Sequence, residues 1–130
     1  YAMARLEELA LQLGLTEDQG FMDTYARYKL DVLDHAALYE RFVDQVRRGE
    51  TLGSDVSMLK IMGTENYQKI SQLLVETAGS AGGLVGDVDM AGDSFDWLTS
   101  YYNARPATIY GGSNEIQRNI LSSQVLGLKS

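Results

Sequence analysis

The 130-residue sequence has no cysteine, a single proline and a single histidine. Without cysteine the chain has no disulfide framework, no thiolate nucleophile and no cysteine-ligated zinc site. His35 has no second histidine or cysteine to complete a metal site, so we expect it in the core or at an interface and expect no metal. No apolar run approaches the roughly 20 residues that span a bilayer, and the first residues lack the order of a signal peptide.

Basic residues are also scarce. The chain has 11 lysines and arginines against 18 acidic residues, which gives a formal net charge of −7. Nucleic acids and anionic membranes are bound by clustered lysine and arginine, so we expect neither as a partner. Because the chain also lacks cysteine, we expect a cytoplasmic protein.

The length and the hydrophobic content of 45% suit one domain, residues 1–130. The first residues, Tyr1 to Ala10, already follow a helical pattern and include no residue that would cap a helix. We therefore interpret the chain as a fragment of a longer protein.

Apolar residues recur at helical spacing through most of the chain, and alternating strand patterns are nearly absent. Residues 79–93 contain too many glycines for a helix and form the main loop, and Pro106 is expected to break a short helix. The predicted helices cover residues 1–13, Thr16 to about Arg48 with a capping box at Thr16 and Gln19, Ser54 to about Ala78 with Ser54 as cap, Ser94–Asn103, and Ser113 to about Leu126. The predicted fold is all-α, an antiparallel up-and-down four-helix bundle with an extra short helix.

One segment is too particular to be generic. Residues 108–120 read Thr-Ile-Tyr-Gly-Gly-Ser-Asn-Glu-Ile-Gln-Arg-Asn-Ile, a turn with paired glycines that leads directly into an amphipathic helix. Gly111 and Gly112 suit a tight bend or a close approach to a ligand, and Ser113 can cap the helix that follows. Such a corner suits a polar or anionic edge of a cofactor.

This segment closely resembles the C-terminal signature of the acyl-CoA dehydrogenases, in particular the helical C-terminal domain of the bacterial type. The resemblance extends from about Leu13 to Leu128. It implies FAD as cofactor, an acyl-CoA substrate desaturated between Cα and Cβ, an electron-transfer acceptor and a place in fatty acid metabolism. It also implies that the chain is a C-terminal domain, inactive alone, that supplies contacts of a homo- or hetero-oligomer.

The resemblance also assigns roles to individual residues. Gly112 matches a backbone position that contacts substrate, and Gly111 stands where many members carry the glutamate base. The resemblance therefore assigns no catalytic base within this chain. FAD contacts fall on two segments: Ser113, Asn114 and Glu115, and, for the cofactor of a neighbouring subunit, Glu76, Thr77, Ala78, Gly79 and Ser80.

Other interpretations remain open. Ser113 can be a simple helix cap, and Glu115 can be a charge that suits the first helical turn. Both are ordinary uses of these residue types. Glu76 replaces the usual glutamine, Gly111 lacks a carboxylate, and the arginine expected to hold the FAD phosphate has no clear counterpart, since Arg5 matches poorly. These departures favour an alternative, a non-catalytic subunit of a hetero-oligomeric dehydrogenase; a helical interaction module is a further one.

Overall fold

The computed structural model describes residues 1–90 and 92–128, and five α-helices make up most of this part of the chain. The helices are α1 (Ala2–Gln12), α2 (Gln19–Arg47), α3 (Ser57–Thr77), α4 (Trp97–Ala107) and α5 (Asn114–Ile120). Short helical turns join or extend them: η1 (Leu15–Glu17), η2 (Ser54–Val56), η3 (Gly79–Gly83) and the π-helical η4 (Leu121–Val125). The predicted all-α class is confirmed.

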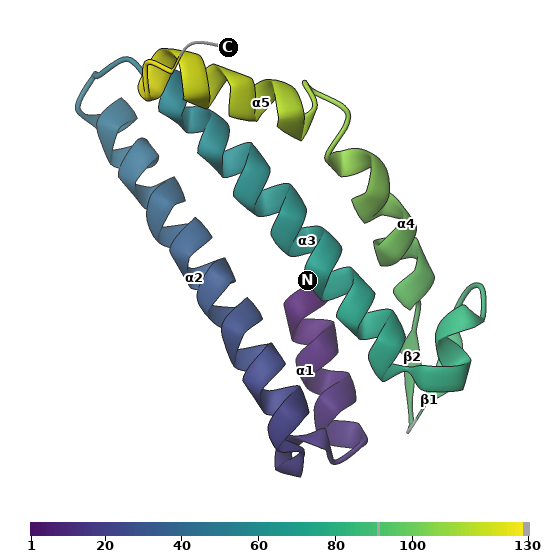
Figure 1. The fold of residues 1–130 in the computed structure, drawn as a ribbon. Helices are drawn as coiled ribbons and strands as arrows, with labels where there is room; N and C mark the ends of the chain where they lie inside the picture. The colour runs from purple at the N-terminus through teal and green to yellow at the C-terminus, as the bar shows by residue number, and fades with distance from the viewer. Residues whose placement is uncertain (91, 129–130) are drawn as a thin grey trace.

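Helix α3 is the centre of the molecule. Helix α2 runs antiparallel along one side of α3, and α1 lies beside the C-terminal half of α3, while α4 and α5 follow one another along the opposite side (Figure 1). Each of the other helices therefore packs against α3. This arrangement places the turn between α4 and α5 beside the first half of α3.

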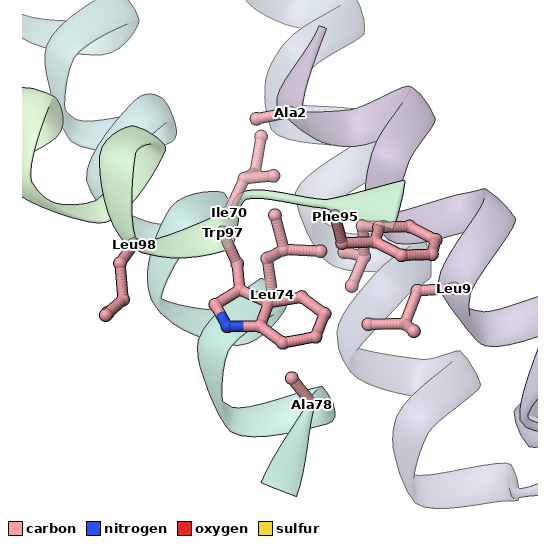
Figure 2. Close-up of a cluster of buried hydrophobic side chains, with 9 residues drawn as sticks. Ala2, Leu9, Ile70, Leu74, Ala78, Phe95, Trp97 and Leu98 are labelled. Carbon is pink, nitrogen blue, oxygen red and sulfur yellow. The ribbon is translucent and has the colours of Figure 1, made fainter. Parts of the chain in front are cut away.

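The main hydrophobic core lies where α1, the second half of α3 and the start of α4 meet (Figure 2). Leu6 and Leu9 of α1 are fully buried, as is Trp97. The rings of Trp97 and Phe95 stack with centroids 5.8 Å apart, and the Trp97 indole N–H donates to the Ala81 carbonyl at 3.1 Å. Burial of each large side chain stabilises the fold by roughly 1.5–3 kcal/mol, so this cluster holds α1, α3 and α4 together.

A short β-hairpin follows α3, which we did not predict. Strand β1 (Val88–Met90) pairs antiparallel with β2 (Asp93–Phe95). The predicted start of the fourth helix at Ser94 is therefore wrong, because Ser94 belongs to β2. Helix α4 begins instead after Asp96, whose carboxylate accepts a hydrogen bond from the Thr99 amide at 3.1 Å and caps the helix.

The predicted break before Pro106 is also wrong, since α4 continues through Pro106 to Ala107. Proline removes the N–H that would bind the Tyr102 carbonyl one turn earlier. The Pro106 carbonyl then accepts the amides of Ile109 and Tyr110 at 2.9 and 3.1 Å, which closes the helix.

Two predicted N-caps differ from the structure. Asp18, not Thr16, caps α2 by accepting an α2 amide at 2.8 Å, while Thr16 lies in η1. Ser54 lies in η2, and α3 begins at Ser57 without a side-chain cap. The Ser54 hydroxyl instead donates to Gln124 at 2.5 Å and ties the start of α3 to η4. At Thr16 a neighbouring residue takes over the capping role, and at Ser54 a partner distant in the sequence binds the hydroxyl. In both cases the local capping pattern does not decide the structure.

Candidate functional site

The glycine turn, residues 108–113, joins α4 to α5. Gly111 and Gly112 have φ angles of +65° and +87°, a left-handed region that side chains strain. The Thr108 carbonyl accepts the Asn114 amide at 2.9 Å and closes the turn. The bare backbone of Gly111 and Gly112 is exposed, so main-chain groups form the surface here.

Polar side chains hold the glycine turn against α3. The Lys60 ammonium donates to the Gly112 carbonyl and, at 3.3 Å, to the side-chain oxygen of Asn114. Asn114 is only 2% exposed, and its amide nitrogen donates to the Thr64 hydroxyl at 3.0 Å and to the Glu65 carboxylate at 3.3 Å. The C-terminal end of the turn is therefore fixed to α3 through a connected set of hydrogen bonds.

The start of α5 is as predicted. The Ser113 hydroxyl caps α5 by accepting an amide of the helix at 3.4 Å. The pKa of the Glu115 carboxyl is lowered, first by its own backbone N–H and then by the Ser113 hydroxyl and the charges of Arg118 and Lys60. Arg118 also pairs with Glu65 of α3. Ser113 and Glu115 thus have clear structural roles at the start of α5.

The outer side of the glycine turn combines apolar side chains with free amides. Ile109 is exposed and Tyr110 is 63% exposed. Within residues 1–90 and 92–128, the amides of Gly111, Gly112 and Ser113 have no acceptor. Apolar surface beside a few directed polar groups is typical of sites for organic ligands.

The second predicted cofactor segment lies at the other end of α3. Glu76 is exposed near the end of α3, and Thr77 is half-buried as its last residue. Ala78 is buried against the core, whereas Gly79 and Ser80 are exposed at the start of η3. These five residues form one continuous stretch in which only Ala78 faces inward.

The structure does not bring the two predicted segments together within one chain. Glu65, beside Asn114, and Glu76 are separated along α3 by about 16 Å at the usual rise per residue. The glycine turn lies beside the first half of α3, and residues 76–80 form the far end of α3 and the start of η3 (Figure 1). Each segment is therefore a separate surface on this chain.

His35 lies between α2 and α3, as the sequence suggested. Its Nε2 is 3.1 Å from the Leu59 carbonyl, and a Cβ added to Gly63 would come within 3.1 Å of its ring. Gly63 thus permits the close contact of the two helices. In the described part of the chain no group of three or more histidine, cysteine or acidic residues suits a metal ion, and no helix has the length and hydropathy to cross a membrane.

Sequence reasoning missed Lys60, Thr64 and Glu65. A signal was available, because Lys60, Thr64 and Gln68 recur every four residues and so share one face of α3. That face meets the glycine turn and the end of α4, where Gln68 donates to the Ala104 carbonyl at 3.1 Å. Polar residues at helical spacing inside an otherwise packed helix indicate a polar partner.

A helical bundle built around α3, with a glycine turn anchored to it, is consistent with the all-α C-terminal domain of an acyl-CoA dehydrogenase. The family described as "Acyl-CoA dehydrogenase, C-terminal domain" matches residues 7–126, so the chain belongs to this family. Over 79 residues it is 37% identical to acyl-CoA dehydrogenase IpdE1 of Mycobacterium tuberculosis, and over 80 residues it is 36% identical to IpdE1 of Mycolicibacterium smegmatis. Each match covers 61% of this chain and 19% of the relative.

The fold is also similar to solved structures. A protein named Tcur3481-Tcur3483 steroid ACAD superposes with a TM-score of 0.81 at 22% identity, over 98% of this chain and 34% of that one. A variant of it gives a TM-score of 0.80 at 23% identity. At these identities the likeness concerns the fold alone. The chain spans about a fifth of the length of its curated relatives.

Proposed function

We propose that this chain is the C-terminal helical domain of an FAD-dependent acyl-CoA dehydrogenase that desaturates an acyl-CoA thioester between Cα and Cβ. The observation that carries the proposal is the glycine turn, the part of the chain most like the family's signature. Its two glycines expose main-chain amides, and Lys60 and Asn114 hold the turn on α3. A rigid backbone corner of this kind suits the positioning of a ligand.

We assign the residue roles from the family resemblance, taken together with the position of each group. Ser113 and Glu115 border the outer side of the turn and would contact FAD, and the Gly112 backbone would contact substrate. The Asn114 side chain is engaged by α3 and its amide by the Thr108 carbonyl, so this residue would serve the site by holding the turn in place. FAD, when bound, supplies the electron acceptor that no side chain provides, and passes electrons to a further protein.

The distant segment would serve a second cofactor. Residues 76–80 lie at the far end of α3 from the glycine turn, which supports a role toward FAD in a neighbouring subunit and not toward the same molecule. A homo- or hetero-oligomer is part of this proposal. Tcur3481-Tcur3483 carries two names joined as one assembly, which supports it.

A second candidate function is a non-catalytic subunit of a hetero-oligomeric dehydrogenase. Gly111 has no side chain, so the position of the usual base carries no carboxylate. Glu76 also adds a negative charge where an anionic cofactor would approach. In this candidate the chain completes the site of an active partner subunit, and the base comes from that partner.

The substrate class is suggested by a relative. Tcur3481-Tcur3483 is named a steroid ACAD. We therefore propose that the substrates tested should include an acyl-CoA whose acyl group is a side chain attached to steroid rings. Straight-chain acyl-CoAs of matched length provide the comparison.

Anaerobic titration of the full-length protein, alone and with its partner subunit, tests both candidates. A dehydrogenase retains yellow flavin, and the flavin absorbance bleaches when a suitable acyl-CoA is added. A non-catalytic subunit neither holds flavin nor bleaches it until the partner is present. Absence of flavin and of bleaching in every combination would contradict both candidates.

A matched pair of glycine variants tests the glycine turn itself. Gly111 and Gly14 have nearly equal φ angles, +65° and +68°, and at neither would an added Cβ meet another atom within 4 Å. Gly111→Leu and Gly14→Leu should therefore cost similar stability, about 1–2 kcal/mol. We expect only Gly111→Leu to reduce flavin bleaching, by at least about ten-fold, because its side chain would occupy the ligand side of the turn. Equal bleaching in the two variants would contradict the placement of the site.

A further inference from the structure

Lys60 is an unusual lysine for a bundle with abundant carboxylates. It is half-buried on α3 beneath the glycine turn, and its ammonium donates to the Gly112 carbonyl and the Asn114 side-chain oxygen. In the described residues no carboxylate pairs with Lys60, although seven other ion pairs occur there. Neutral oxygens of the turn and of Asn114 therefore satisfy this cation.

The position of the Gly112 carbonyl determines where the next amide points. The described chain has no cis peptide bond, and in a planar trans peptide the carbonyl and the following N–H point in opposite directions. Because Lys60 draws the Gly112 carbonyl toward α3, the Ser113 N–H is directed away from α3. No acceptor among residues 1–90 and 92–128 meets that amide.

A peptide next to two glycines needs such an anchor. Because Gly112 has no Cβ, its ψ angle is weakly restrained, so the peptide between Gly112 and Ser113 is freer to rotate than a peptide between two residues with side chains. The charge-assisted hydrogen bond from Lys60 restrains that peptide, since hydrogen bonds to a charged donor are stronger than neutral ones.

We propose that Lys60 is a positioning residue: it fixes the peptide between Gly112 and Ser113 so that the Ser113 amide is presented to an acceptor oxygen of the ligand. The ligand's identity rests on the proposed function, and the oxygen belongs either to FAD or to the acyl-CoA. The two sources differ in what is lost when the amide is misplaced. Loss of an FAD contact releases flavin, whereas loss of an acyl-CoA contact alters KM or kcat with the flavin retained.

Two pairs of variants in the full-length protein, with its partner subunit, test the proposal. Lys60→Met removes the donor and keeps an unbranched stem, and Lys69→Met is its control on the same helix, where Lys69 is exposed and pairs with Asp31 at 3.2 Å. Ser113→Pro removes the amide itself. Ser113 has a φ of −62°, which proline adopts without strain. Ser113→Ala is the reference that loses the hydroxyl but keeps the amide.

We expect Lys60→Met to speed hydrogen–deuterium exchange in residues 108–118 by at least about ten-fold relative to Lys69→Met, the effect of losing one good hydrogen bond. We expect both Lys60→Met and Ser113→Pro to lower flavin retention or kcat/KM by at least about ten-fold below their controls. Wild-type exchange in Lys60→Met would overturn the proposal, as would Ser113→Pro values equal to those of Ser113→Ala. A wild-type protein without flavin or turnover would instead contradict the proposed function, and exchange in residues 108–118 would then decide whether Lys60 holds the turn.

Discussion

Asn114 joins the candidate site to the rest of the molecule. Its side chain contacts Lys60, Thr64 and Glu65 of α3 and is almost completely buried. Successive residues of a helix point about 100° apart, so Asn114 faces inward while Glu115 faces solvent. Residues with adjacent numbers and the same predicted ligand thus have different tasks, and only the buried one orders the turn.

Asp96 allows a prediction about pH at the residue scale. Its hydrogen bonds with the Thr99 side chain and amide lower the pKa of its carboxyl. Because the folded protein favours the ionised form, the stabilisation is complete above the ordinary carboxyl pKa of about 3.9 and declines as the pH falls through the lowered value. We expect Asp96→Ala to reduce the free energy of unfolding by about 1 kcal/mol at neutral pH, and by less in acid.

Urea unfolding followed by circular dichroism at neutral and acid pH measures this difference. Asp96→Asn is the control for the charge, since asparagine also caps helices but does not titrate; it should lose less stability than Asp96→Ala at neutral pH, and the difference from the wild type should shrink in acid. A loss in Asp96→Ala that is the same at both pH values would show that the charge of Asp96 does not contribute.

At the scale of elements, the start of α4 fastens the glycine-rich segment to the core. Trp97 follows directly after the cap of α4 and is fully buried, and its indole N–H reaches back to the Ala81 carbonyl in η3. The same ring stacks on Phe95 of β2. One side chain therefore connects η3 and β2 to α4.

Replacing Trp97 by phenylalanine should loosen this junction. The variant leaves the Ala81 carbonyl with the Leu84 amide but without the indole donor, and it leaves a small cavity beside Phe95. We expect a loss of about 2–4 kcal/mol in the free energy of unfolding, measured by circular dichroism in urea. Tyr102→Phe, on the exposed side of the same helix, should change it by less than about 0.5 kcal/mol. Similar losses in the two variants would contradict this account of the junction.

At the scale of the whole molecule, α2 has an apolar face that no other helix covers. Leu30 and Leu33 are 60% and 55% exposed, and Ala26 and Ala37 lie on the same face one turn away on either side. Phe42 is the one residue of α2 that is fully buried within the chain. An exposed apolar stripe of this kind is typical of a contact between subunits, as the proposed oligomer requires.

Two neighbouring substitutions on α2 test this assignment. Leu33→Gln removes an exposed apolar side chain, whereas Asp34→Gln places the same residue at the next exposed position without loss of apolar surface. We expect Leu33→Gln to weaken assembly of the full-length protein by about ten-fold or more, and Asp34→Gln to leave it nearly unchanged. Light scattering after size-exclusion chromatography measures the assembly. Equal masses for Leu33→Gln and the wild type over a dilution series would remove this face from the interface.

A feature of the fold is harder to predict from the sequence when the residues that determine it lie far apart in the chain. The C-terminal end of α2 and the capped start of α5 depend on residues a few positions apart, and these were close to the prediction. The predicted final helix to about Leu126 is α5 only to Ile120, after which η4 is π-helical. The caps at Thr16 and Ser54 failed because Asp18 offered a better local acceptor and Ser54 bonds to Gln124. The start of α4 failed because Phe95 is drawn into the core through β2.

The sequence by itself determined that this protein is helical, the approximate positions of its helices and that a turn with two glycines precedes a capped helix, because periodicity, capping and backbone sterics act locally. Only the tertiary structure decided that Lys60 meets the Gly112 carbonyl, that Asn114 faces inward and that the two predicted cofactor segments lie at opposite ends of α3. Those contacts join residues far apart in the chain, and packing around α3 selects them.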